Sequence, residues 1–348
     1  MKKTKEATLA NGQSRTDKII GFITAHKIWF IILAIAAAIL LPVIVTSSYY
    51  RAIFIKTLIY ALLASSLNAI NGYSGQFNIG HAGFYCIGAY TYAIIATRWG
   101  VNFFVMLPVA GIAAGLAGYI ISLPTLRLKG MYLAMVTMGA GEVIRLIAIS
   151  WRSVTKGNNG ISAIPAPSIF GYKLSSLLNY YYIILVLLII MLFLTYRVIN
   201  SRIGRAWMSI REDQNASAFL GVEIKRYKSN NFVYGAFWAG IAGCFAAAFF
   251  QYIQPELFNF TRSTEILSMV ILGGQGTLVG PLLGAFTVSF LTEVLRFSDQ
   301  FRLIIYAILI ILMMWFRPQG LVGAKHSVLA KRLEIKKHKT PAEKKVTR

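Results

Sequence analysis

The residues best suited to chemistry lie in a glycine-rich stretch, Asn71 to Gly83, where hydrogen-bonding side chains alternate with small residues. Its polar side chains are Asn71, Tyr73, Ser74, Gln76, Asn78 and His81, and its glycines are Gly72, Gly75, Gly80 and Gly83. The set holds one imidazole and no carboxylate, thiol or ammonium group. It can bind a polar solute through hydrogen bonds, but it offers no set of metal ligands and no nucleophile with a base. We therefore expect binding chemistry here and not catalysis.

A second glycine-rich stretch, residues 273–281, interrupts the apolar pattern further along the chain. Each stretch leads into an apolar run with an early Gly-Ala pair, Gly88-Ala89 and Gly284-Ala285, which hints at an internal duplication. Interrupted segments in matching halves indicate the substrate path of a transporter. Close helix packing is the alternative; the polar side chains argue against it for the first stretch, and the second leaves it open. The residues predicted to line the path are Tyr73, Ser74, Gly75, Gln76, Asn78, Gly80, His81, Gly83, Gly274, Gly276 and Thr277.

Glu142 and Arg145 are a charged pair within an apolar run. Because they lie three positions apart, they share one face of a helix and can neutralise each other. Charges inside membrane segments mark either ion pairs or substrate contacts, and this spacing favours the structural pair over the substrate contact. The sequence contains no phosphate-binding loop, no His-Glu-x-x-His and no plausible Ser/His/Asp set. It therefore predicts a protein that is not an enzyme, that needs no cofactor or metal, and that relies on another chain if ATP drives it.

The composition indicates a membrane protein. The chain has 348 residues, of which 57% are hydrophobic and 14% charged, whereas soluble domains carry about 25% charged residues. In a soluble chain the net charge of +23 would suggest nucleic acid. Here the charge lies in loops and termini, where it orients the chain and meets anionic lipid, so no nucleic-acid partner is expected. Cys86 and Cys244 both lie in apolar runs and are expected to be small core residues.

The apolar runs predict an all-α polytopic fold of about ten transmembrane segments. They are residues 28–45, 52–70, 84–97, 103–123, 131–150, 180–196, 232–250, 266–272 as a half-length crossing, 282–295 and 303–316. The glycine-rich stretches make two of the helices broken, which hydrocarbon allows only against protein or a water-filled cavity. If both stretches are re-entrant, the count is eight. Residues 28–322 thus form a transmembrane domain between a basic N-terminus, 1–27, and a basic tail, 323–348.

The distribution of positive charge predicts the orientation. With both termini on one side, 25 of the 35 Lys and Arg residues fall on that side and eight on the other, while Lys56 and Arg145 lie within spans. Because positive charge concentrates on the cytoplasmic side, both termini are expected inside the cell. The first apolar run is full length and follows a long basic stretch, so it predicts an uncleaved anchor and not a signal peptide.

A polar island, residues 197–231, separates two apolar runs and carries seven Lys and Arg residues. Ala206, Trp207 and Ile210 can share one side of a first short helix. Asp213 can cap a second helix that stops at Gly221. Two short amphipathic helices on a basic loop form either a docking surface for a soluble partner or a loop lying on lipid headgroups, and the residues alone leave these readings equal.

Five stretches resemble the branched-chain amino acid ABC transporter permeases. They are residues 71–90, 128–137, 155–161, 204–213 and 273–281, in collinear order within about residues 47–322. The resemblance implies a bacterial inner-membrane, multi-pass subunit that forms the path for branched-chain amino acids. It also implies four partners: a homologous second permease, two cytoplasmic ATP-binding subunits and a periplasmic amino-acid-binding protein.

The resemblance makes the polar island the loop that couples to the ATP-binding subunits, and so favours docking. The residues predicted for this role are Gly204, Arg205, Ala206, Ile210, Arg211, Glu212, Asp213, Ala216 and Gly221. Urea and short-amide permeases are similar, so they are the alternative within the same machine. A secondary transporter or channel that works alone is the rival class, but a mutually neutralised Glu142-Arg145 pair is poor machinery for ion coupling.

Overall fold

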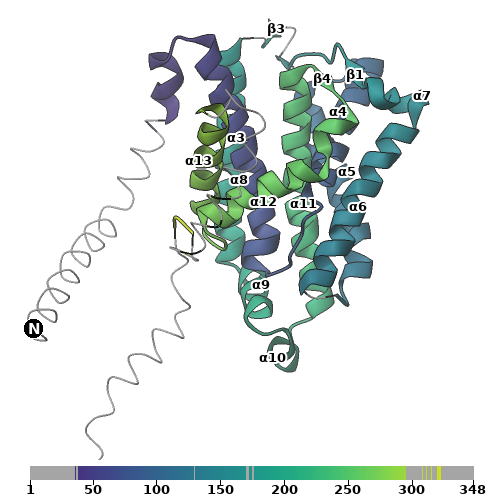
Figure 1. Cartoon of the computed structure of the whole chain (residues 1–348), viewed down its shortest axis with the longest axis vertical. Helices are drawn as coiled ribbons and strands as arrows, with labels where there is room; N and C mark the ends of the chain where they lie inside the picture. The colour runs from purple at the N-terminus through teal and green to yellow at the C-terminus, as the bar shows by residue number, and fades with distance from the viewer. Residues whose placement is uncertain are drawn as a thin grey trace, which may run out of the picture. The chain divides into compact units, whose positions relative to one another are not determined.

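Long α-helices make up most of the part of the chain that the computed structural model describes (Figure 1). The described residues are 38–128, 130–169, 172–174 and 176–294, together with positions 36, 308, 311, 315 and 320–322. The α-helices are α3 (Ser48–Asn68), α4 (His81–Trp99), α5 (Phe103–Thr125), α6 (Gly130–Ser150), α7 (Arg152–Thr155), α8 (Leu177–Ile199), α9 (Arg202–Glu212), α10 (Gln214–Phe219), α11 (Ile224–Phe250), α12 (Phe260–Gly273) and α13 (Gly280–Val294). A π-helix, η1 (Ala69–Tyr73), continues α3, and η2 (Gly157–Asn159) and η3 (Pro255–Phe258) are 3-10 turns.

Five of the helical segments are long and apolar enough to cross a membrane. They are Ser48–Tyr73, Phe103–Thr125, Gly130–Ser150, Leu177–Ile199 and Ile224–Phe250. The prediction of an all-α membrane protein is therefore confirmed. The count of ten is untested, because the first predicted span is described only in part and the last lies outside the described residues except at three isolated positions.

Small residues place α11 at the centre of the packing, against α4 and α5. A Cβ at Gly240 would meet the Ala110 carbonyl oxygen and the Ala114 methyl group, and one at Gly88 would collide with the Gly240 backbone. Without side chains at these points the helix axes approach closely, which is how small residues hold membrane helices together. Cys86 and Cys244 are free thiols buried in this packing, as predicted.

The start of α11 lies earlier than the sequence pattern predicts. The span was expected from Phe232, but the helix begins at Ile224, so the end of the polar island is helical. Lys228, Ser229 and Asn231 are buried on this first part of the helix. Their polarity suggested a loop, whereas it serves hydrogen bonds to neighbouring segments.

The two glycine-rich stretches both interrupt helices, as predicted. Residues 74–80 separate η1 from α4, and residues 274–279 separate α12 from α13. We call these segments the first break and the second break. The half-length crossing predicted at residues 266–272 is the end of α12, whose 14 residues rise by about 21 Å. Such a helix is too short to cross a hydrocarbon layer of about 30 Å.

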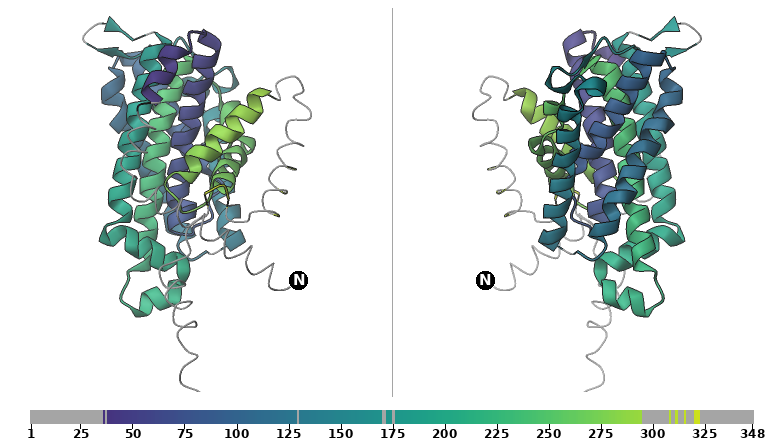
Figure 2. Two further views of the ribbon diagram at one scale, coloured as in Figure 1. Left: turned by 90° about the vertical axis from the view of Figure 1, so that its left-hand side faces the viewer. Right: turned by 90° about the vertical axis from the view of Figure 1, so that its right-hand side faces the viewer.

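Short strands and short helices lie at opposite ends of the long helices (Figures 1 and 2). At one end β1 (Ile161–Ser162) pairs antiparallel with β4 (Tyr252–Ile253), which ties the long loop before α8 to the end of α11. A second antiparallel pair, β2 (Ser168–Ile169) with β3 (Tyr172–Lys173), lies in the same loop. Helices α9 and α10 lie at the other end.

The chain divides into two units at Ala52, within α3. In the described part of residues 1–52, the Arg51 Nε atom donates hydrogen bonds to the Pro42 and Val45 carbonyl oxygens at 3.1 and 2.8 Å. These bonds close the turn that precedes α3. All the features below belong to residues 53–348.

Candidate functional site

A network of side chains holds the first break. The Asn78 backbone N–H donates to Asn71 Oδ1 at 3.1 Å, and Asn71 Nδ2 donates to the Asn78 carbonyl oxygen at 3.3 Å. Asn78 Oδ1 accepts from the Gly80 N–H at 3.0 Å. His81 Nε2 lies 2.7 Å from Ser66 Oγ on α3, and its Nδ1 lies 3.4 Å from Asn78 Nδ2. The polar side chains of this motif thus replace the backbone bonds that the broken helix lacks.

A second part of the network ties the first break to α11. Gln76 Nε2 donates to Ser74 Oγ, to the Lys228 carbonyl oxygen and to Asn231 Oδ1, at 3.0, 3.3 and 3.2 Å. Asn231 Nδ2 in turn donates to the Ala69 carbonyl oxygen at 2.8 Å. The buried polar residues at the start of α11 therefore supply hydrogen-bond partners for the first break and for the helix end that precedes it.

The predicted path residues of this motif are mostly enclosed. The side chains of Tyr73, Ser74, Gln76, Asn78 and His81 are all buried. Ser74, Gly75 and Gln76 border a cavity near α9, and Gly80 and Gly83 border another cavity near α6. In this conformation the polar groups of the motif hydrogen-bond mainly within the protein and do not line an open channel. Their role in a substrate path remains a prediction.

The second break is held by few side chains, and backbone hydrogen bonds hold the end of α12 before it. Thr277 Oγ1 donates to the Gly274 carbonyl oxygen at 2.8 Å and accepts from the Gly280 N–H at 3.0 Å. Residues 321 and 322 donate backbone N–H groups to the carbonyl oxygens of Leu272 and Gly273, at 2.9 and 3.0 Å, and so satisfy the end of α12. Gly276 has a φ of +76°, a conformation that a side chain disfavours.

The second break touches the helical segment that leads into the first break. Asn68, the last residue of α3, donates from Nδ2 to the Thr277 carbonyl oxygen and accepts at Oδ1 from the Gly276 N–H, both at 2.8 Å. A Cβ at Gly72 would lie 2.5 Å from the Gly276 nitrogen, so no side chain fits between them. The sequence predicted both interruptions but gave no sign that one amide joins the second to the end of α3.

Arg211 on α9 reaches both breaks. Its Nη1 donates to the Gly72 carbonyl oxygen. A Cβ at Gly75 would lie 3.0 Å from the Arg211 Cγ atom, and one at Gly276 would collide with its guanidinium. One residue of the predicted coupling set therefore lies against the glycines of the predicted path.

Helix α9 packs firmly, as its predicted face requires. Ala206, Trp207 and Ile210 are buried together. Trp207 Nε1 donates to the Tyr227 carbonyl oxygen on α11 at 3.0 Å, and Gly204 lies against the end of α8, where a Cβ would collide with Ile199. Arg205 is exposed and donates to the Asn200 carbonyl oxygen at 3.2 Å.

Helix α10 begins as predicted but presents its apolar residues outward. Asp213 Oδ1 accepts from the N–H groups of Asn215 and Ala216 at 2.7 and 3.0 Å, which confirms the cap. Gly221 follows with a φ of +81°. Phe219 and Leu220 are 92% and 84% exposed. Glu212 and Ala216 are exposed as well. Two large apolar side chains exposed side by side are typical of a surface that a partner or lipid covers.

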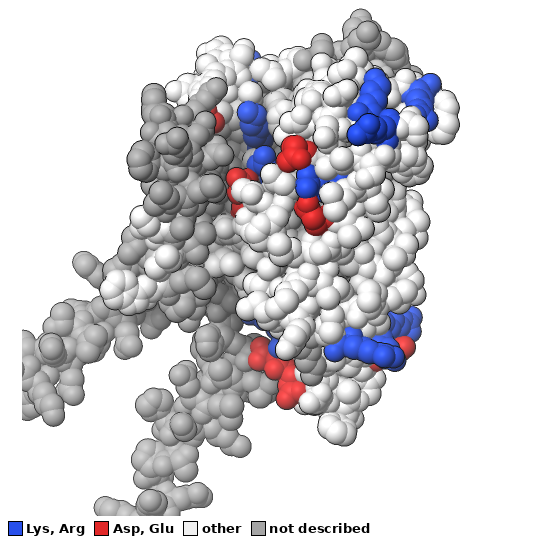
Figure 3. Space-filling view, turned by 45° about the vertical axis from the view of Figure 1, so that its right-hand side comes forward, with Lys and Arg blue, Asp and Glu red and all other residues white. Residues whose placement is uncertain are grey.

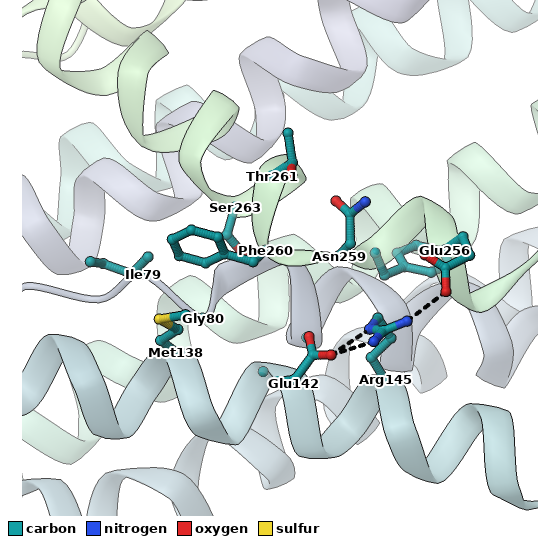
Figure 4. Close-up of a pocket in the computed structure, with 13 residues that line it drawn as sticks. Ile79, Gly80, Met138, Glu142, Arg145, Glu256, Asn259, Phe260, Thr261 and Ser263 are labelled. Atoms are coloured by element: carbon teal, nitrogen blue, oxygen red, sulfur yellow. Dashed lines mark hydrogen bonds and ion pairs between the residues drawn. The ribbon is translucent and has the colours of Figure 1, made fainter. Parts of the chain in front are cut away.

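A charged cluster borders the cavity near α6, which we call the charged pocket (Figure 4). The Arg145 guanidinium lies between two carboxylates: Nε donates to Glu142 Oε1 at 2.8 Å, and Nη1 donates to Glu256 Oε1 at 2.7 Å. The predicted Glu142-Arg145 pair is thus confirmed. Glu256, in the turn η3 before α12, is a third member that the sequence did not reveal, because it lies 111 positions away.

Comparisons with known proteins place these features in context. The family model described as branched-chain amino acid transport system / permease component matches residues 49–314. The chain is 36% identical over 289 residues to the high-affinity branched-chain amino acid transport system permease protein LivM of Escherichia coli, covering 76% of this chain and 68% of that protein. It is 26% identical over 285 residues to the LivH protein of Salmonella typhimurium, covering 76% and 91% of the two chains. No solved structure matches the chain.

Proposed function

Because the chain belongs to the branched-chain amino acid transport permease family, we propose that it is a permease subunit of an ABC importer. It forms, with a homologous second permease, the path for branched-chain amino acids across the bacterial inner membrane. Two separate cytoplasmic subunits bind ATP and drive the cycle, and a periplasmic protein supplies the amino acid. The names of the related LivM and LivH proteins support the substrate.

The observation that carries the proposal is the position of α9 and α10. On one side Arg211 contacts Gly72 and lies against Gly75 and Gly276, at both breaks. On the other side Phe219 and Leu220 extend away from the protein. Lys228 Nζ on α11 donates to Gln214 Oε1 at 3.0 Å and links α10 to the core. An element attached to the broken helices at one end and open to a partner at the other is suited to transmit a movement.

The proposed topology uses the position of α9 and α10 at one end of the long helices and of the short strands at the other. The proposal places α9 and α10 in the cytoplasm, with both termini, and places β1 and β4 outside, in a fold of ten crossings. The excess of positive charge on the terminal side supports this orientation. Cysteines introduced at Asn159 and Asn215 should react with impermeant thiol reagents from opposite sides of the membrane. Labelling of both from one side would contradict the topology.

The path proposed for the amino acid follows the predicted residues around the two breaks. A zwitterion must keep its charged ends matched as it crosses, and around the breaks helix ends with neutral polar groups can do this. Weak contacts also suit a subunit whose selectivity lies in a separate binding protein, since a tight site would slow release. The structure supports this with the cavities that adjoin Gly75, Gly80 and Gly83.

The test is ATP-dependent uptake of labelled leucine by purified, reconstituted complexes. The chain should co-elute with its ATP-binding subunits, and the complex should take up leucine only with ATP and the binding protein. Ala216→Pro removes an N–H that Asp213 caps and disrupts α10, so it should abolish uptake at normal abundance. Arg202→Met, an exposed change on α9, is the control and should transport normally. Uptake without ATP, or normal uptake by the proline variant, would refute the proposal.

A further inference from the structure

The charged pocket lies within the span of α6. Glu142 lies about 18 Å along a helix whose 21 residues rise by about 31 Å, so the cluster is inside the hydrocarbon thickness. Figure 3 shows acidic and basic atoms together in the upper half of one face, with further charged atoms beside and above them and a broad uncharged surface below. Ionisable groups at membrane depth face a bundle interior or a water-filled cavity and mark solute routes. A purely structural ion pair would need only one carboxylate.

The three charged groups leave hydrogen-bonding capacity unused. A guanidinium has five N–H donors, and Arg145 uses Nε, one on Nη1 and one on Nη2, which leaves two. Glu142 and Glu256 both bind through Oε1, and their Oε2 atoms have no hydrogen bond within the described residues. Arg145 is 16% exposed, whereas the side chains of Glu142 and Glu256 are 39% and 61% exposed. The cluster carries a net charge of −1, with its cation at the bottom and its anions at the rim.

The rest of the pocket, whose volume is about 230 Å³, is lined by apolar side chains, by glycines and by the neutral polar residues Asn259, Thr261 and Ser263. Ile79, Met138, Phe258 and Phe260 supply apolar surface. On the floor, Gly83 and Gly141 lie so close that a Cβ at Gly83 would be 2.9 Å from the Gly141 Cα atom. Pockets for drug-sized ligands measure about 300–1,000 Å³, so this one suits a smaller solute. Figure 4 shows Glu142 and Arg145 pointing from α6 toward Glu256, with Phe260 and Ser263 across the pocket.

We propose that the charged pocket is a transient binding site for a zwitterionic amino acid with an apolar side chain. The two free N–H groups of Arg145 take the α-carboxylate, the Oε2 atoms of Glu142 and Glu256 take the α-ammonium, and the apolar side chain lies on Ile79, Met138 and Phe260. A site with both signs of charge rejects molecules that carry only one of them, because one buried group is then left without its partner. The inference rests on the proposed function and adds a location and a mode of recognition to it.

Photo-leucine, a diazirine analogue that keeps the ammonium, the carboxylate and an apolar side chain, tests the site directly. Purified complexes in detergent, without the binding protein, are irradiated with millimolar photo-leucine, and the adducts are mapped by mass spectrometry. Adducts are expected on peptides that contain Ile79, Met138 or Phe260. Excess leucine should remove them, while 4-methylpentanoate, which lacks the ammonium, and 3-methylbutylamine, which lacks the carboxylate, should compete at least about tenfold less well.

Two charge-removing variants separate recognition from packing. Glu256→Gln should lower the adduct yield at least about tenfold. Glu265→Gln removes the carboxylate of a second Arg–Glu pair with the same spacing, on α12 and outside the pocket lining, and should leave the yield unchanged. Adducts only elsewhere on the chain, or equal losses in both variants, would overturn the site. Leucine uptake by the same complexes is measured separately, so a failure of the proposed function shows itself as lost uptake and not as a shifted adduct.

Discussion

The first and second breaks solve one problem in two ways. Both interrupt a helix within the membrane region, where unpaired backbone groups are costly. The first break is held by buried side chains, among them Asn71, Gln76 and Asn78. Within the described residues the second is held by two side chains, its own Thr277 and Asn68 from α3, while the backbone of residues 321 and 322 holds the end of α12 before it.

This difference predicts that the first break is a rigid scaffold and that the second is a flexible joint. Buried polar networks that are fully satisfied fix one conformation, and removing one member costs stability. A segment of glycines with few side-chain contacts can change its backbone angles at low cost. We therefore expect the first break to keep its shape while the second changes during transport. Substitutions in the first should lower stability and uptake together, and substitutions in the second should lower uptake with a smaller effect on stability.

Gly80→Val should have the largest effect. A Cβ at Gly80 would overlap the Thr137 carbonyl group on α6, and a backbone cannot yield as a side chain can. Overpacking of this kind costs about 1–3 kcal/mol or more. We expect uptake to be abolished and the unfolding temperature of the complex to fall. Gly139→Val is the matched control, because a Cβ at Gly139, also on α6, meets nothing within 4 Å. Normal uptake and unchanged unfolding of Gly80→Val would show that the first break is not a rigid scaffold.

Asn68→Leu should rank second, because it removes the two hydrogen bonds that tie the second break to the end of α3. The Gly276 N–H and the Thr277 carbonyl oxygen would both lose their partner. A buried polar group left unpaired costs about 1–3 kcal/mol. We expect uptake to fall by about tenfold, with a lower unfolding temperature. Wild-type behaviour in both measurements would mean that the breaks work independently.

The sequence predicted the features that depend on local pattern. Both interruptions, the cap at Asp213 and the pair Glu142-Arg145 all follow from residues within one or two helical turns of each other. The contact between Asn68 and Gly276 joins positions 208 apart, and no periodicity encodes it. Glu256 was missed for the same reason.

Two further features of the structure were not predicted from the sequence, because the polarity of a side chain does not determine its surroundings. Asn231 suggested a loop, since a polar residue is usually solvated, yet it hydrogen-bonds to Ala69 inside the bundle. The sequence also gave no sign that Phe219 would be 92% exposed. A partner chain can cover an exposed apolar side chain as a protein core does, and one sequence does not show the partner.

Gly276→Ala tests the joint and should have a moderate effect. At a φ of +76° an alanine costs about 1–2 kcal/mol, and its Cβ would displace the Arg211 guanidinium. Gly130→Ala is the control, with a φ of +57° and nothing within 4 Å of the added Cβ. Both variants should lose similar stability, but only Gly276→Ala should lower leucine uptake several-fold relative to ATP hydrolysis. If both variants lowered the ratio of uptake to ATP hydrolysis equally, the contact between Gly276 and Arg211 would have no part in coupling.

His81→Gln should have the smallest effect and gives the sharpest distinction between a scaffold and a solute contact. His81 is fully buried, and its two ring nitrogens lie 2.7 Å from Ser66 Oγ and 3.4 Å from Asn78 Nδ2. Glutamine has both a donor and an acceptor and can keep one of these bonds, so the loss of the other costs about 1 kcal/mol. Uptake should fall about two- to fivefold, in proportion to the loss of stability.

His81→Leu completes this test, because leucine removes both bonds: Asn78 Nδ2 loses its partner, which should cost about 1–3 kcal/mol, and Ser66 Oγ keeps only its bond to the Leu63 carbonyl oxygen. The order of wild type, Gln and Leu should therefore be the same for unfolding temperature and for uptake. If His81→Gln instead abolishes uptake in a complex of normal stability, the imidazole acts on the solute. The first break would then be part of the moving path, and the distinction between the two breaks would fail.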